Sequence, residues 1–360
     1  MTPRRFLAIR ALFACVCGSA IAEPPSDSWR FAVGGDSRNC GDVVMPAVAA
    51  GARADGALFY WHLGDFRAIS DFDQDIVAAG QARTGRPMTI ADYQKSAWDD
   101  FIDNQLSPFG EIPVYLGIGN HELVAPKGRA EFLAQFADWL MSEPVSRQRL
   151  ADDPHDHRLK TYYHWIESGL DFITLDNASP DQFDADQVKW FEGVIARDAA
   201  NPAIRTIIVG MHAALPDSIA AGHSMNDWSQ GEQSGRRVYE DLLKVRAGGK
   251  RVYVIASHSH FYLSGVFATD YWRSHGGVLP GWIIGTTGAI RYALPAGAAA
   301  AREARTNVYG FLQGEATSDG AVRFEFHEVR ESDVPPAVVE KFTPQLVHDC
   351  FTGNRETPSR

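Results

Sequence analysis

Short apolar runs alternate with amphipathic segments through the first two thirds of the chain. The apolar runs predict buried strands at 29–33, 57–63, 112–118, 162–166, 170–175, 204–209 and 252–256. Apolar residues at helical spacing predict helices at 43–54, 92–106, 129–141, from 185 onward and at 235–246. After residue 260 the pattern predicts strands alone, at 262–267, 281–284, 308–313 and 322–328.

This order of elements favours an α/β fold. Strand–helix alternation followed by strands alone predicts two sheets that pack face to face, with helices on their outer sides. The polar stretches 66–91, 142–160 and 213–234 are predicted to be loops. They would shape any substrate pocket, but they contain no motif that identifies a substrate.

The first 22 residues have the features of a secretory signal peptide. Arg4 and Arg5 precede a mostly apolar stretch, and residues 20–22 offer a cleavage site with small side chains. The apolar run after Arg10 is short for a membrane of ~30 Å. We therefore expect residues 1–22 to be removed and the mature protein to be periplasmic or secreted, without a stable membrane anchor. Residues 23–360 would form a single domain with a surface tail from about residue 330.

Removal of the signal peptide would leave two of the four cysteines, Cys40 and Cys350. In an oxidising compartment these two can form a disulfide between the segment after the first strand and the C-terminal region. Two unpaired thiols, or a metal-bound thiolate at Cys40, are the alternatives.

The charge of the chain excludes one class of partner. Without the three arginines of residues 1–22, the 34 basic residues fall to 31 against 45 acidic ones, so the formal net charge of −11 becomes −14. Such a surface repels the phosphates of nucleic acids, so we expect no nucleic acid as a partner. A small phosphate-ester substrate would have to be held locally, by cations and a few basic side chains.

Five polar clusters follow apolar runs, and their side chains suit metal binding. They are Gly35-Asp36-Ser37-Arg38, Gly64-Asp65, Gly119-Asn120-His121-Glu122, Gly210-Met211-His212 and Ser257-His258-Ser259-His260. Side chains at the carboxyl ends of strands meet at one edge of an α/β sheet. Carboxylate, amide oxygen and imidazole are ligands for Fe, Mn and Zn. The pattern therefore predicts a metal centre with the ligands Asp36, Asp65, Asn120, His212, His258 and His260.

In these clusters and their order, the chain resembles the calcineurin-like metallophosphoesterases, the superfamily that includes the purple acid phosphatases. The resemblance covers roughly residues 30–330. It implies a four-layer αββα sandwich of two mixed β-sheets flanked by helices. It also implies two metal ions, with Fe, Mn and Zn as the candidates. The implied ligands are Asp36 and His260 for the first ion, Asp65 as a bridge, and Asn120, His212 and His258 for the second.

The resemblance implies a metal-dependent phosphoric ester hydrolase, and we expect a phosphomonoesterase. A metal-bound hydroxide would attack phosphorus in line, and His121 would protonate the leaving oxygen. His223 and Trp228 lie in the loop after His212, where the resembled enzymes often place substrate contacts. A phosphodiesterase of the same fold is an alternative, and so is a catalytically weak protein that binds metal or phosphate.

Two positions depart from the pattern of the family. Many members have a His two residues after the first Asp, where this chain has Arg38. Purple acid phosphatases have a Tyr three residues after the bridging Asp, where this chain has Ala68. The first ion is therefore short of one protein ligand; water, substrate, Asn39 and Ser37 are the candidates for that place, and weak binding of the ion is the alternative. Because a guanidinium group is planar and always cationic, it suits an oxyanion rather than a metal, and we assign Arg38 to the substrate phosphate.

Other histidines receive no ligand role. His155-Asp156-His157 imitates a metal-binding pair, but it lies in a charged stretch without a predicted strand. His62 and His164 lie within predicted strands, and we expect both to be buried or hydrogen-bonded. The sequence contains no signal for the oligomeric state.

Overall fold

The computed structural model describes residues 28–178, 182–220 and 222–356. The predicted signal peptide lies outside the described residues and stays a prediction. Within them, one sheet has five strands in the order β12-β11-β1-β2-β3, and the other has seven in the order β10-β8-β9-β7-β6-β5-β4. The strands are β1 (Ser28–Gly34), β2 (Ala57–His62), β3 (Val114–Leu116), β4 (Tyr163–Glu167), β5 (Leu170–Thr174), β6 (Thr206–Met211), β7 (Arg251–Ala256), β8 (Tyr262–Ser264), β9 (Gly281–Ile284), β10 (Glu303–Arg305), β11 (Tyr309–Thr317) and β12 (Val322–Val329).

Both sheets are mixed, as predicted. In the first, β1, β2 and β3 run parallel, β11 is antiparallel to β1, and β12 is antiparallel to β11. In the second, β5, β6, β7 and β9 run parallel, β4 is antiparallel to β5, β8 is antiparallel to β9, and β10 is antiparallel to β8. The strands predicted between residues 29 and 328 are present, and β10 is an addition that the apolar pattern did not indicate.

Aromatic side chains join the two sheets face to face. Phe31 of β1 meets Phe172 of β5 at a ring-centroid distance of 5.0 Å. Tyr115 of β3 stacks on Trp165 of β4 at 3.8 Å. These side chains are at most 5% exposed, so they form a dry layer between the sheets. Face-to-face packing of the sheets, predicted from the order of elements, is confirmed.

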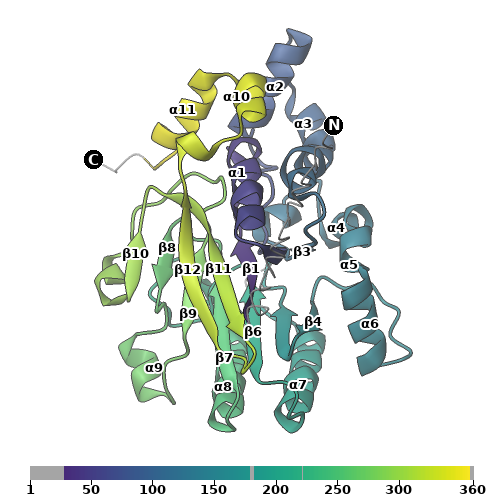
Figure 1. The fold of residues 1–360 in the computed structure, drawn as a ribbon, viewed down its shortest axis with the longest axis vertical. Coiled ribbons are helices and arrows are strands. Elements are labelled where there is room, and N and C mark those ends of the chain that lie inside the picture. Colours follow the sequence, from purple (N-terminus) through teal and green to yellow (C-terminus); the bar gives the residue numbers. More distant parts are fainter. Residues whose placement is uncertain (1–27, 179–181, 221, 357–360) are drawn as a thin grey trace, which may run out of the picture.

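Helices cover the outer sides of the sandwich (Figure 1). The helices are α1 (Gly41–Ala54), α2 (Gln74–Thr84), α3 (Ile90–Phe101), α4 (Arg129–Gln135), α5 (Ala137–Leu140), α6 (Glu143–Asp152), α7 (Ala185–Ala200), α8 (Ser229–Ala247), α9 (Asp270–Ser274), α10 (Pro336–Phe342) and α11 (Pro344–Thr352). On one side α1 contacts β2, β11 and β12; on the other α8 contacts β7 and packs against α7. Asp184 caps α7 by accepting the backbone N–H of Gln187. The α/β, four-layer αββα sandwich is therefore confirmed.

The loop predictions need three corrections. Helix α2 lies within the predicted loop 66–91, and α6 lies within the predicted loop 142–160. Helix α8 begins at Ser229, inside the predicted loop 213–234 and before the predicted start at residue 235. Only Val145 is buried on α6, so the segment shows no apolar periodicity. The sequence signal for this helix is Pro144, which suits a first helical turn.

The C-terminal segment, predicted as a surface tail, folds into α10 and α11 beside α1 and α2 (Figure 1). It buries the side chains of Phe342, Val347 and Cys350. Cys350 forms a disulfide with Cys40, which directly precedes α1. Of the alternatives for Cys40, the disulfide is the one the structure contains. No helix in the described part of the chain is long and apolar enough to cross a membrane.

Candidate metal centre

The six predicted ligands converge where strands of both sheets end. Asp36 follows β1, Asp65 follows β2, and Asn120 begins a short 3₁₀ turn after β3. His212 directly follows β6, while His258 and His260 follow β7. Their ligand atoms form two groups, Asp65–His212–His258 and Asp36–Asp65–His260, and within each the atoms lie within 4.8 Å of one another. Asp65 belongs to both groups, which is the arrangement expected of a bridging ligand.

His212 lies at the middle of one group. Its Nδ1 faces the backbone carbonyl of Leu63 at 3.0 Å, so Nδ1 carries the hydrogen and Nε2 carries a lone pair. That Nε2 lies 2.9 Å from Asn120 Oδ1, 3.0 Å from His258 Nδ1 and 3.3 Å from Asp65 Oδ1. An imidazole lone pair, an amide oxygen and a carboxylate oxygen are all acceptors, so a positive charge must satisfy them.

These separations fit a metal ion. Two ligands that bind one ion at about 2.1 Å lie about 3.0–3.4 Å apart in octahedral or tetrahedral geometry. The site favours positive charge: burial lowers the pKa of His212, but the Asp65 carboxylate outweighs it and raises that pKa to about 9. Burial and the neighbouring His212 lower the pKa of His258 to about 3, so its ring is neutral and able to donate a lone pair. Asp65, Asn120, His212 and His258 therefore fit a metal ion.

The second group, Asp36–Asp65–His260, has the guanidinium group of Arg38 as its neighbour. His260 Nδ1 donates to the carbonyl of Ile290 at 2.6 Å, which leaves a lone pair on Nε2 beside Asp36 Oδ1 at 3.1 Å. Arg38 Nη2 also lies 3.1 Å from that Nε2, and Arg38 Nε lies 3.7 Å from Asp65 Oδ2. The guanidinium group thus lies between Asp65 and His260. As these side chains stand, this group does not fit a second cation.

The backbone around the centre is strained. Asp36, Asp65 and His258 have φ values of 60°, 60° and 63°, in the left-handed region. Each such residue costs about 1 kcal/mol or more and persists only where surrounding contacts enforce it. Asp36 Oδ2, for example, accepts the backbone N–H of His258 at 2.7 Å. The strain turns carboxylates and imidazole toward one point.

Glu122 and Gly119 support the centre, and sequence analysis assigned neither a role. The buried Glu122 carboxylate accepts the backbone N–H groups of Asp65, Phe66 and Gly119 at 2.8–2.9 Å. It therefore ties the loop after β2 to the loop after β3. Gly119 leaves room for the bridging ligand, because a Cβ there would lie 2.4 Å from Asp65 Oδ1. Glu122 is part of the Gly119–Glu122 motif, but its role depends on a contact with Asp65, 57 residues away in the sequence.

The remaining predicted site residues fall at different distances from the centre. His121 joins it: its backbone N–H donates to Asp65 Oδ1 at 2.9 Å, and its Nε2 lies 3.9 Å from Asp65 Oδ2. His223 lies at the rim, with its ring 5.5 Å from that of His258. Trp228, directly before α8, is 53% exposed, and none of the contacts identified in the described residues joins it to the centre. Its role as a substrate contact stays a prediction.

Tyr292 is a further residue at the centre that sequence analysis missed. Its ring stacks on His260 at 4.0 Å and on His223 at 5.2 Å. Its hydroxyl lies 3.5 Å from Arg38 Nη2. Tyr292 thus forms one wall of the site beside the guanidinium group. Because it follows no predicted strand, the sequence offered no signal for it.

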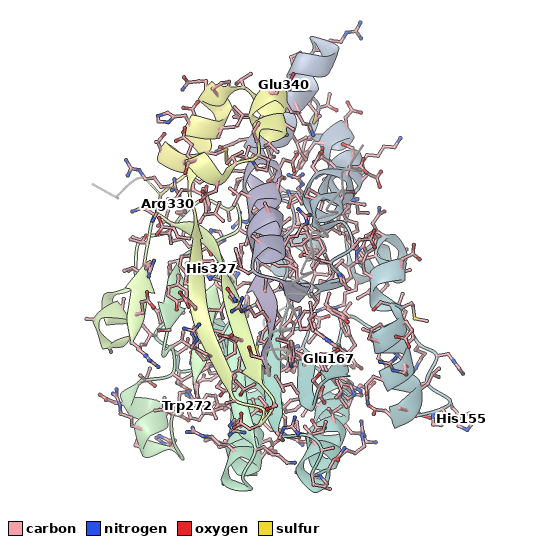
Figure 2. All side chains as sticks on the ribbon, in the orientation of Figure 1. His155, Glu167, Trp272, His327, Arg330 and Glu340 are labelled. Carbon is pink, nitrogen blue, oxygen red and sulfur yellow. A yellow bond between two sulfur atoms is a disulfide. The ribbon has the colours of Figure 1, made fainter. Side chains whose placement is uncertain are left out.

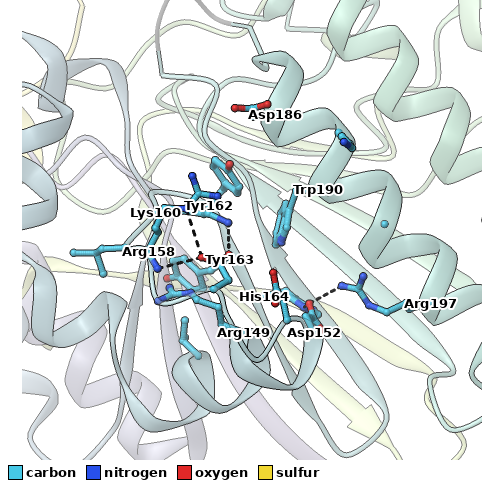
Figure 3. Close-up of a pocket in the computed structure, with 16 residues that line it drawn as sticks. Arg149, Asp152, Arg158, Lys160, Tyr162, Tyr163, His164, Asp186, Trp190 and Arg197 are labelled. Carbon is cyan, nitrogen blue, oxygen red and sulfur yellow. Dashed lines mark hydrogen bonds and ion pairs between the residues drawn. The ribbon is translucent and has the colours of Figure 1, made fainter.

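A cavity of about 610 Å³ lies apart from the metal centre, between α6, α7 and β4 (Figure 3). Some of its charged groups are paired: His164 lies between Asp152 and Asp171, and Arg197 contacts Asp152. None of the residues that line it belongs to the centre. As predicted, His164 and His62 are buried and hydrogen-bonded. His155 is exposed at the edge of the molecule, away from the strand ends (Figure 2).

Comparison with known proteins supports the fold. No protein-family model matches the chain, and no curated protein matches its sequence. Among solved structures, PhoD is similar with a TM-score of 0.51 and 13% identity, over 84% of this chain and 72% of that one. Purple acid phosphatase PPD1 from yellow lupin (Lupinus luteus) seeds aligns with a TM-score of 0.49 and 16% identity over 84% of this chain. This chain spans about half of that phosphatase, 52% of its length.

The similarity to PhoD therefore supports the fold that the resemblance to the calcineurin-like metallophosphoesterases implied, and it extends to the fold alone.

Proposed function

We propose that the protein is a metal-dependent phosphoesterase that acts on small phosphomonoesters in the periplasm or outside the cell. The observation that carries this proposal is the convergence of acceptor atoms around His212 Nε2, where Asp65, Asn120 and His258 all lie within 3.3 Å. The fold shared with phosphoesterases supports it. A bound cation would polarise the phosphoryl group and lower the pKa of a water molecule.

Arg38 would hold the substrate. Its side chain is 13% exposed, and its Nε has no hydrogen-bond partner among the described residues. A phosphoryl oxygen is a suitable acceptor for that N–H, and a guanidinium group binds phosphate through two parallel N–H donors. Arg38 would therefore orient the phosphoryl group and stabilise its negative charge.

His121 would deliver the proton to the leaving group. Its Nδ1 donates to the carbonyl of Ala68 at 2.5 Å, which fixes the ring and leaves Nε2 on the side of Asp65. A protonated Nε2 there is placed to donate to the departing ester oxygen. Ala68 thus takes part through its backbone, although its side chain cannot bind a metal.

An oxidising location agrees with the disulfide between Cys40 and Cys350, because disulfides are rare in the cytosol. The signal peptide predicted at residues 1–22 supports the same location. Precursor processing on expression, read from the N-terminus of the mature protein, would test it.

The test of the function uses purified protein stripped of metal and reloaded with Mn, Zn or Fe. We expect hydrolysis of p-nitrophenyl phosphate, slower hydrolysis of bis-p-nitrophenyl phosphate, and loss of both in Asp65→Asn. Faster hydrolysis of the bis-ester would instead indicate the phosphodiesterase. A fully loaded protein that hydrolyses neither ester would contradict the proposal.

A catalytically weak metal- or phosphate-binding protein is the second candidate, and the contact of Arg38 with His260 favours it. Such a protein would bind inorganic phosphate when loaded with metal but would show no turnover. His121→Ala separates the two: it lowers turnover in an enzyme and leaves phosphate binding by a binding protein unchanged.

A further inference from the structure

We propose that the guanidinium group of Arg38 takes the place of the first of the two implied metal ions, so that the protein binds one ion per chain. This inference rests on the proposed metal-dependent function. It differs from the expectation of two ions, and it assigns the ion to Asp65, Asn120, His212 and His258.

The lone pair of His260 carries the argument. A neutral imidazole has one lone pair in its plane, and the hydrogen on Nδ1 is fixed by the carbonyl of Ile290 at 2.6 Å. The lone pair on Nε2 therefore accepts the N–H of Arg38 Nη2 at 3.1 Å. A metal ion bound to Nε2 at about 2.1 Å would overlap that nitrogen or require Arg38 to leave.

The carboxylates of the same group also have partners. Arg38 Nε lies 3.7 Å from Asp65 Oδ2, so its positive charge lies beside the bridging carboxylate. Asp36 uses Oδ2 to accept the backbone N–H of His258 at 2.7 Å. Asp36 is fully buried, which strengthens these interactions. A divalent cation at this position would face the fixed guanidinium charge at close range.

Neighbouring groups hold the guanidinium in this position. Tyr292 stacks on His260 at 4.0 Å, and its hydroxyl lies 3.5 Å from Arg38 Nη2. The side chain of Asn39 accepts the backbone N–H of Ile290 at 3.1 Å, next to the carbonyl that orients His260. Arg38 is therefore packed into the site rather than lying over it.

With the guanidinium group in place of the first ion, the chemistry is divided between Arg38 and the single ion. A guanidinium group supplies positive charge and N–H donors to phosphoryl oxygens, but it has no vacant site for a water ligand. Arg38 would orient and stabilise the phosphoryl group, and activation of water would depend on the ligands of the single ion. Asp36 and His260 would position Arg38 instead of binding metal.

The test is the number of ions per chain, measured by elemental analysis after metal stripping, reloading with Mn²⁺ and removal of free metal. We expect one ion in the wild type and two in Arg38→His, which replaces the guanidinium with a metal ligand. Arg147→His is the matched control, because Arg147 is 66% exposed on α6 and away from the centre, and it should keep one ion. His212→Ala should bind none, and His260→Ala should keep one.

Each other result overturns the inference. Two ions in the wild type would overturn it and leave the phosphoesterase proposal standing. One ion that is lost in His260→Ala but kept in His212→Ala would show that the metal binds at Asp36, Asp65 and His260 instead. One ion in Arg38→His would show that the guanidinium does not exclude a second cation. No ion in the wild type would overturn both proposals.

Discussion

Replacing Arg67 with methionine tests the buried charge cluster that holds two ligand-bearing loops together. Arg67 is fully buried and contacts four carboxylates, those of Asp42, Asp73, Asp75 and Asp100. Asp42 lies on α1, after the loop that carries Asp36, while Arg67 follows Asp65. The guanidinium group of Arg67 therefore links the segment after β1 to the segment after β2.

The structure sets the size and the pH dependence of the effect. Removing one partner of a buried ion pair destabilises a protein by about 3–5 kcal/mol. Burial raises the pKa of Asp42 to about 7 although Arg67 opposes the shift, and burial together with Asp42 raises that of Asp75 well above its usual value. Carboxyls with raised pKa values bind more protons in the folded state, so stability falls as pH rises. Without Arg67 these pKa values rise further, and the loss is larger at about pH 8 than at about pH 5.

The assay is urea unfolding of the metal-free protein, followed by tryptophan fluorescence at both pH values. Arg147→Met is the control, because Arg147 and its partner Glu143 are 66% and 71% exposed. An exposed pair contributes at most about 1 kcal/mol. A loss below about 1 kcal/mol for Arg67→Met at the higher pH, or a larger loss at the lower pH, would refute this reasoning.

Three further predictions concern catalysis and stability. His121→Ala should lower kcat about 10²–10⁴-fold with unchanged metal content, measured by p-nitrophenyl phosphate turnover and elemental analysis; lost metal would contradict its role as an acid. Replacing Cys40 and Cys350 by serine should lower the free energy of unfolding by about 3–5 kcal/mol in urea, because the bond spans 310 residues, and equal midpoints would contradict this. Burial lowers the pKa of His164, but Asp171 outweighs it and raises that pKa to about 10. The stabilisation from protonated His164 is therefore complete below about pH 6.5 and is lost as the pH rises toward about 10. Between these pH values the urea unfolding midpoint of His164→Gln should change less than that of the wild type. An equal change in both proteins would contradict the role of His164.

The fold and the ligand candidates were largely predictable because their signals are local. Asp36, Asp65 and His212 each follow an apolar run that ends at the rim of a sheet. A strand that is buried on both faces leaves its polar residues at its ends, so composition alone locates such positions. Helix α6 was missed for the opposite reason, since it buries little and its polar residues show no periodicity.

What decides the chemistry of the centre was not predictable, because it depends on contacts between distant segments. Arg38 and His260 are 222 residues apart, and no local pattern shows that one fills the space beside the other. Tyr292 and Glu122 likewise act through packing and backbone contacts. The sequence showed that Arg38 departs from the family pattern, and the structure shows what the departure does to the neighbouring ligand atoms.

The central claim is that one point between the two sheets binds a metal ion. The most direct test is a crystal structure of the Mn-loaded protein with anomalous diffraction recorded at the manganese edge. We predict an anomalous peak about 2.1–2.2 Å from His212 Nε2, bounded by Asp65, Asn120 and His258. A loaded protein without a peak at this position, or with its ion elsewhere, would contradict the account.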